Sequence, residues 1–199
     1  YKYTTHTLEN ITWDQIAQTI NGSVLDNPAS KVKVVFVPTY LNGNDGIFNK
    51  SYYELLVGMD LTVFASYYEP WGYTPLESIA FSTPTVTSSL AGFGAWVKKF
   101  GYNSGITVIH RDDFNDKEAI AAIADKLLGF SRLTEEETKK ARKEALEASK
   151  HALWPNLFEN YEKAYSLAVE NSIARTNRAI LEDGGSSNEQ INFVRQQLI

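Results

Sequence analysis

The sequence predicts an α/β fold in which a mostly parallel sheet is covered by helices on both faces and is followed by C-terminal helices. Three observations support this prediction. Short apolar runs rich in β-forming residues alternate with segments of helical periodicity. The connections between them are short, as in a β-α-β-α arrangement. The predicted strands are continuous apolar runs rather than alternating ones, which indicates a sheet buried on both faces.

The first elements are a helix, a strand and a second helix. The polar, turn-rich start of the chain contains one expected helix, from about Ile11 to Ile20. The run Lys31 to Val37 predicts the first strand, which Pro38 ends. Residues 39–50 are rich in Asn, Asp and Gly and predict a loop, and a short helix is expected from Ser51 to Gly58.

Three further strands alternate with helices in the middle of the chain. The β-forming run 61–65 predicts a strand, and a helix is expected from Thr74. The run 84–88 predicts the next strand, and a helix should end near Phe100. Residues 105–109 predict the last strand. The sequence therefore predicts four parallel strands in all.

The last third of the chain predicts helices only. Residues 116–130 predict a helix, with an apolar face at Ile120, Ile123, Leu127 and Leu128. A charged helix is expected from 133 to 151, opened by a capping box, and another from about 156 to 171. After a Gly- and Ser-rich link, a terminal helix should carry four apolar residues: Ile191, Phe193, Val194 and Leu198.

We expect two regions. Residues 1–132 should form a Rossmann-like domain, and residues 133–199 a helical extension that packs on it or on a domain outside this chain. Because four strands are fewer than the six usual in a Rossmann-like sheet, we expect the opening strands to precede Tyr1. The chain does not begin with Met, and its single Met is Met59, which indicates part of a longer protein.

Composition excludes several classes of function. The chain has 199 residues, with 43% hydrophobic, 13% aromatic and 22% charged residues, which are globular values. A net charge of −5 without a basic stripe argues against a nucleic-acid partner. No run is apolar enough to span a membrane, and no signal peptide opens the chain. There is no cysteine, and the three histidines lack metal-ligand spacing, so neither disulfides nor a metal site is predicted.

The segment Ser66 to Glu77, S-Y-Y-E-P-W-G-Y-T-P-L-E, carries the strongest functional signal. It places the carboxylates of Glu69 and Glu77 eight positions apart, where a buried strand passes through a Gly-containing loop into a helix. Open α/β sheets bind ligands at such a turn. A helix N-terminus there offers backbone N–H groups and a positive dipole end to a phosphate. The segment therefore predicts a nucleotide or sugar-phosphate site.

Part of this segment also has a purely structural interpretation. Thr74, Pro75 and Glu77 match a capping box, with Thr74 as N-cap and Pro75 at the first helical position. Glu77 could then serve only to cap its own helix. No local hydrogen-bonding motif requires a carboxylate at Glu69. Four aromatic residues of the loop could pack in the core or form a platform for a sugar or a base: Tyr67, Tyr68, Trp71 and Tyr73.

The run Tyr67 to Glu77 closely resembles the signature of animal and fungal glycogen synthases, which are retaining glucosyltransferases of the GT-B type with two Rossmann-like domains. The family's run reads Y-E-P-W-G-Y-T-P, then one residue and a Glu. The segment V-K-V-V-F-V-P-T-Y-L-N-G-N and the run Ser88 to Gly94, S-S-L-A-G-F-G, are similar to two further stretches of the family. The resemblance covers roughly residues 4–170 and identifies the chain with the family's C-terminal, donor-binding half.

The resemblance implies a role for each matching residue. Glu69 would contact the sugar of the donor and orient it at the reacting centre, so it is the expected catalytic residue. Glu77 would accept hydrogen bonds from the ribose hydroxyls, and Tyr52 would stack on the uracil base. Packing of a helix start remains the alternative for Tyr52. Three residues would present backbone N–H groups to the diphosphate: Gly72, Tyr73 and Thr74.

The resemblance also implies the partners. The donor would be UDP-glucose and the acceptor the non-reducing end of an α-1,4-glucan, and the reaction would need no metal or other cofactor. The family is cytoplasmic. Its acceptor site and some basic diphosphate ligands lie in parts that would precede Tyr1, so an N-terminal domain is an expected partner and this chain alone should be inactive. A homo-oligomer is compatible with the sequence.

One departure from the family concerns regulation. Animal and fungal enzymes carry an arginine-rich helix that senses glucose 6-phosphate. The matching region here, 138–150, has four lysines and only one arginine, Arg142. Because lysine does not replace arginine in bidentate phosphate binding, activation by glucose 6-phosphate is not predicted. We assign no role to His110, beside Arg111, or to His151.

Two alternatives stay open, and the first is from another class of function. The chain could be a nucleotide- or carbohydrate-binding module without catalytic function, in which case the same turn would serve recognition alone. It could also belong to a related glucosyltransferase that uses ADP-glucose or another acceptor.

Overall fold

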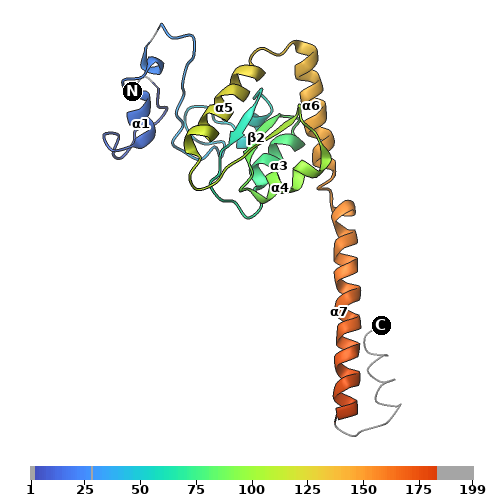
Figure 1. Ribbon diagram of the computed structural model, residues 1–199. Helices are drawn as coiled ribbons and strands as arrows, with labels where there is room; N and C mark the ends of the chain where they lie inside the picture. The colour runs from blue at the N-terminus through green and yellow to red at the C-terminus, as the bar shows by residue number, and fades with distance from the viewer. Residues whose placement is uncertain (1–2, 28, 183–199) are drawn as a thin grey trace. The chain divides into compact units, whose positions relative to one another are not determined.

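The computed structural model describes residues 3–27 and 29–182 of the chain (Figure 1). It divides into two compact units, Tyr1–Asp60 and Leu61–Ile199. The terminal helix predicted around Ile191, Phe193, Val194 and Leu198 lies outside the described residues.

The first unit contains short helices and loops: α1 (Gln15–Ile20), the 3-10 helix η1 (Val24–Asp26) and α2 (Tyr52–Leu56). The predicted helix from Ile11 begins later, at Gln15, because Asp14 caps it by accepting a hydrogen bond from Ala17 N. Helix α2 is confirmed. Ser51 and Glu54 form a capping box at its start.

The predicted strand Lys31 to Val37 is wrong. The structure has one parallel bridge there, between Phe36 and Thr4, with Phe36 N donating to Tyr3 O at 2.6 Å. A strand needs a ladder of backbone hydrogen bonds, and β-propensity reports only how well side chains suit a packed sheet surface. Val35, in the middle of the run, is exposed. Its apolar character therefore did not lead to strand pairing among the described residues.

The second unit is built on a parallel three-stranded sheet in the order β1 (Thr62–Phe64), β2 (Thr85–Ser88) and β3 (Ile106–Ile109). Val63 pairs with Val86, and Val86 with Thr107. The predictions for these three strands and for their parallel arrangement are confirmed. The remaining predicted strand, at 31–37, is the one that the structure does not form.

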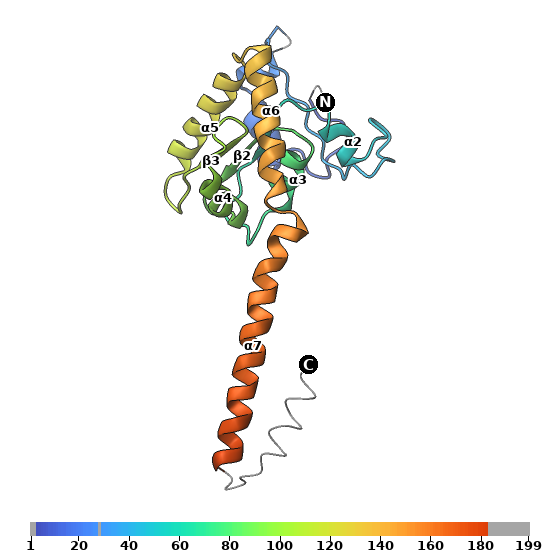
Figure 2. The same cartoon turned by 90° about the vertical axis from the view of Figure 1, so that its right-hand side faces the viewer.

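Helices cover both faces of this sheet, as predicted (Figures 1 and 2). Helices α3 (Tyr73–Ala80), α4 (Gly92–Val97) and α6 (Glu135–Lys150) share one core with β3. Its buried members are Ile79, Phe93, Val97, Ile106, Ala145 and Ala148. Helix α5 (Asp116–Phe130) covers the other face, where Ala119 packs with Val86 and Ile109.

The apolar face predicted for α5 is only partly correct. Ile123 packs against the core, but Ile120, Leu127 and Leu128 are exposed. The small side chain of Ala119 takes the central buried position instead. Helical periodicity therefore located the helix correctly and placed its buried face inaccurately.

The first of the C-terminal helices begins as the sequence indicates, and the second does not. Thr134 and Glu137 form the predicted capping box of α6, with Thr134 N donating to Glu137 Oε2 at 2.8 Å. Hydrogen bonds from the backbone and the hydroxyl of Thr134 lower the pKa of Glu137. Helix α7 (Trp154–Glu182) begins earlier and ends later than predicted. Pro155 lies in its first turn, where a proline needs no hydrogen-bond partner for its nitrogen.

Candidate functional site

The loops that follow the three strands meet at the carboxyl edge of the sheet. Ser88, the last residue of β2, donates its hydroxyl to Ser66 O in the loop after β1, at 2.6 Å. Ser89, in the loop after β2, accepts a hydrogen bond from Arg111 N, in the loop after β3, at 2.9 Å. Ligands bind at this edge of open parallel sheets. The three loops are therefore held together where a site is expected.

Glu69 is fixed by its backbone. It forms an isolated parallel bridge with Ala91: its N–H donates to Leu90 O at 3.3 Å, and its carbonyl accepts from Gly92 N at 3.0 Å. The two loops approach so closely that a Cβ on Gly92 would lie 2.2 Å from Pro70 O. Only glycine allows this approach.

Gly72, and not Thr74, is the N-cap of α3. Gly72 has a φ of +99°, a conformation that favours glycine, and α3 begins at Tyr73. No side chain caps this helix. The predicted capping box is wrong, because Thr74 and Glu77 are the second and fifth helical residues instead of the N-cap and third. Capping therefore does not explain the carboxylate of Glu77.

The structure brings most of the predicted site residues together. A Cβ on Gly72 would lie 3.4 Å from Cγ of Glu69, so the Glu69 side chain runs beside the start of α3. Glu69 and Glu77 are half-buried, while Tyr73 and Thr74 are exposed. The side chain of the half-buried residue Glu69 thus lies next to an uncapped helix N-terminus, whose first backbone N–H groups have no partner within the helix.

The aromatic residues of the loop have different environments. Trp71 packs against Phe93 and Trp96, with ring centroids 6.3 and 5.5 Å away, so it belongs to the core. Tyr67, Tyr68 and Tyr73 are exposed. The packing alternative therefore holds for Trp71.

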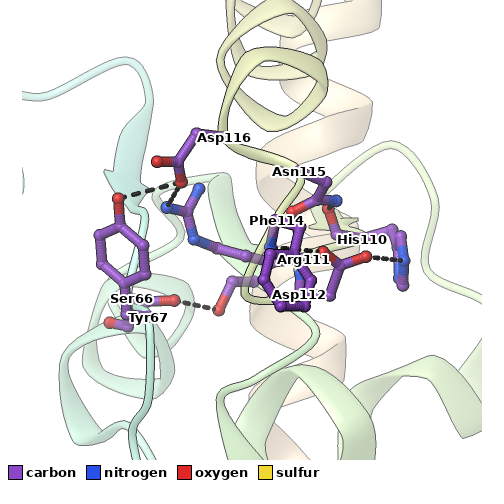
Figure 3. Close-up of polar contacts among 9 residues, drawn as sticks. Ser66, Tyr67, His110, Arg111, Asp112, Phe114, Asn115 and Asp116 are labelled. Atoms are coloured by element: carbon purple, nitrogen blue, oxygen red, sulfur yellow. Dashed lines mark hydrogen bonds and ion pairs between the residues drawn. The ribbon is translucent and has the colours of Figure 1, made fainter.

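Sequence reasoning missed a cluster beside the Glu69 loop (Figure 3). Arg111, after β3, is only 6% exposed, and its guanidinium carbon lies 3.8 Å from the ring centroid of Tyr67. Arg111 donates to Asp116 Oδ1 at 2.7 Å, and the Tyr67 hydroxyl donates to the same oxygen at 3.0 Å. No local motif could reveal it, because Tyr67 and Arg111 are far apart in the sequence. His110, in contrast, is exposed and lies 3.4 Å from Asp112.

Tyr52 lies in the first unit and not on the loop of Glu69. It is the first residue of α2, its N–H donates to Leu41 O at 2.9 Å, and its ring makes an edge contact with Tyr53. These contacts are what packing of a helix start requires. Its predicted role in stacking on a base stays a prediction.

The described residues contain neither a metal-ligand cluster nor a membrane-spanning helix. Within residues 3–27 and 29–182, no three His, Cys, Asp or Glu side chains are grouped so that they could hold a metal ion. In the same part of the chain, no helix has the length and apolar character needed to cross a membrane.

Comparisons with known proteins agree with these features. A family model described as glycogen synthase matches residues 2–197. The chain is 32% identical to glycogen (starch) synthase isoform 2 of Saccharomyces cerevisiae over 171 residues, which are 83% of this chain and 24% of that protein. It is 30% identical to the liver glycogen (starch) synthase of Mus musculus over 173 residues, 85% of this chain and 25% of the mouse protein. The chain spans about a quarter of the length of these relatives.

Proposed function

The chain belongs to the glycogen synthase family, and we propose that it is the donor-binding half of a retaining glucosyltransferase. The parent enzyme would transfer glucose from UDP-glucose to the non-reducing end of an α-1,4-glucan, in the cytoplasm and without a metal or other cofactor. The observation that carries this proposal is the position of Glu69 beside the uncapped N-terminus of α3, at the carboxyl edge of a parallel sheet.

The chemistry of glucosyl transfer suits this arrangement. Breaking the bond between glucose and phosphate leaves an oxocarbenium-like sugar and a departing diphosphate. Backbone N–H groups of Gly72, Tyr73 and Thr74 would stabilise the charge that develops on the diphosphate. The carboxylate of Glu69 would hold the sugar in its reactive orientation.

Two further contacts would hold the nucleotide. Glu77 would accept hydrogen bonds from the ribose hydroxyls, and the absence of the capping box leaves its carboxylate without that structural role. Tyr52 would stack on the uracil base.

The remaining partners belong to the parent enzyme. Basic diphosphate ligands and most of the acceptor site would come from its N-terminal domain, and the enzyme could act as a homo-oligomer. This chain alone should therefore bind UDP-glucose weakly and transfer no glucose.

The test uses the parent enzyme with Glu69 replaced by alanine. Glu69→Ala should abolish glucosyl transfer from UDP-glucose, while binding of UDP, which lacks the sugar, should largely survive. Glu118→Ala, which removes an exposed carboxylate from α5, is the matched control and should leave both unchanged. Equal loss of transfer and UDP binding in Glu69→Ala would favour a binding module, and full activity would refute the catalytic role.

Donor preference is tested on this chain by thermal shift. UDP should raise its Tm more than ADP does. A larger shift with ADP would favour the related ADP-glucose enzymes.

A further inference from the structure

The buried guanidinium of Arg111 needs a physical explanation. Taking a charged group out of water is costly in free energy, and Arg111 is 6% exposed. Asp116 compensates part of this cost through a 2.7 Å ion pair, and the face of the Tyr67 ring compensates another part. Its Nε–H has no hydrogen-bond partner among the described residues, so the burial is incompletely compensated. Stability alone is therefore a poor reason for a cation here.

The contacts of Arg111 link the loop of Glu69 to the loop after β3 and to α5. Asp116 is the first residue of α5, and its Oδ1 accepts from both Arg111 and Tyr67 (Figure 3). The Arg111 backbone is in turn fixed to Ser89 by two hydrogen bonds, of 2.9 and 3.3 Å. The backbone from which the Arg111 side chain reaches Tyr67 is therefore itself held by the loop after β2.

Tyr67 lies two residues before Glu69 on the same loop. Its side chain is 62% exposed, so the described core does not hold it in place. The stacking on Arg111 and the hydrogen bond to Asp116 supply that restraint instead. Restraining Tyr67 restricts the backbone that leads into Glu69. It adds to the hydrogen bond from Ser88 to Ser66 O and to the backbone hydrogen bonds of Glu69 with Leu90 and Gly92.

We propose that Arg111 is a positioning residue for glucosyl transfer: through Tyr67 and Asp116 it holds the loop that carries Glu69 in its reactive geometry. This inference rests on the proposed function. It assigns Arg111 no contact with the substrate, because its guanidinium is buried beneath Tyr67. A displacement of about 1 Å at a reacting group can reduce a rate about 100-fold.

The test compares graded variants in the parent enzyme. Arg111→Lys keeps the charge and loses the planar fork, and should lower kcat about tenfold or more. Tyr67→Leu, which removes the ring, should have a similar effect. Tyr67→Phe, which keeps the ring on the guanidinium, should retain more activity than Tyr67→Leu. His110→Gln changes the exposed neighbour of Arg111 and should match the wild type.

The readout that separates positioning from general damage is kcat against UDP affinity. Each affected variant should lose kcat and keep the Kd for UDP. Unchanged kcat in Arg111→Lys and Tyr67→Leu, or an equal loss of kcat and UDP affinity, would overturn the proposal. If Arg111→Lys does not fold, the Tyr67 variants, whose substitutions are at an exposed position, provide the test.

The wild-type enzyme and Glu69→Ala distinguish the two proposals. An active wild type whose activity depends on Glu69, with Arg111 and Tyr67 variants unimpaired, would refute positioning and leave the proposed function intact. A wild type that transfers no glucose from UDP-glucose would refute the function, and positioning with it.

Discussion

Replacing Gly92 by alanine tests whether the close contact between two loops holds the candidate site in place. The new Cβ would lie 2.2 Å from Pro70 O and 3.2 Å from Trp71 Cα, both backbone atoms. The loops would have to separate by about 1 Å to reach the ordinary contact of 3.4 Å. Overpacking of this kind costs about 1–3 kcal/mol. The separation would also stretch the hydrogen bonds from Gly92 N to Glu69 O and from Phe93 N to Trp71 O.

The assay is thermal unfolding of the purified protein. At about 2–4 °C per kcal/mol for a chain of this size, Gly92→Ala should lower the Tm by about 2–12 °C. Gly129→Ala is the matched control: Gly129 lies inside α5 with no atom within 4 Å of a new Cβ, so the change should stabilise the helix by about 1 kcal/mol. A Gly92→Ala protein as stable as the wild type would refute the reasoning. So would an equal loss in both variants.

Two further predictions concern α6. Gly105→Ala would place a Cβ 2.5 Å from Ala145 N and should lower the urea midpoint of unfolding. It should leave UDP binding unchanged, because Gly105 precedes β3 and lies away from the carboxyl edge of the sheet. Loss of UDP binding in a variant of full stability would contradict this. Glu137→Ala should lower the Tm at neutral pH, and the difference in Tm from the wild type should shrink in acid. The pKa of Glu137 in the folded protein lies below its ordinary value of 4.5. The stabilisation is therefore present above pH 4.5 and is lost as the pH falls through the folded pKa. A difference independent of pH would show that the carboxylate is not the stabilising group.

The sequence predicted best where the physical cause is local. The capping box at Thr134 was recognised from two residues three positions apart, and the structure forms it. The strand at 85–88 was recognised from its β-branched residues Thr85, Val86 and Thr87, which suit a pleated sheet surface.

Prediction failed where the cause lies elsewhere in the fold. The run 31–37 has strand composition, but strand formation depends on a neighbour, and only Phe36 finds one. No role was assigned to Arg111 from the sequence. Its burial depends on Tyr67, 44 positions earlier along the chain, and on the way three strand ends bring their loops together.

The start of α3 depends both on local sequence and on contacts elsewhere in the fold, and it determines where Glu77 lies on the helix. The residues for a capping box at Thr74 are present, yet the helix begins earlier, because the contacts of the loop with Gly92 and Phe93 set its path and Gly72 permits the turn. Tyr73 and Glu77 are then four positions apart in a regular helix, so they share a face. Their Cα atoms are separated along the axis by about 6 Å. We propose that this spacing lets the helix N-terminus hold the diphosphate while Glu77, one turn later, reaches the ribose.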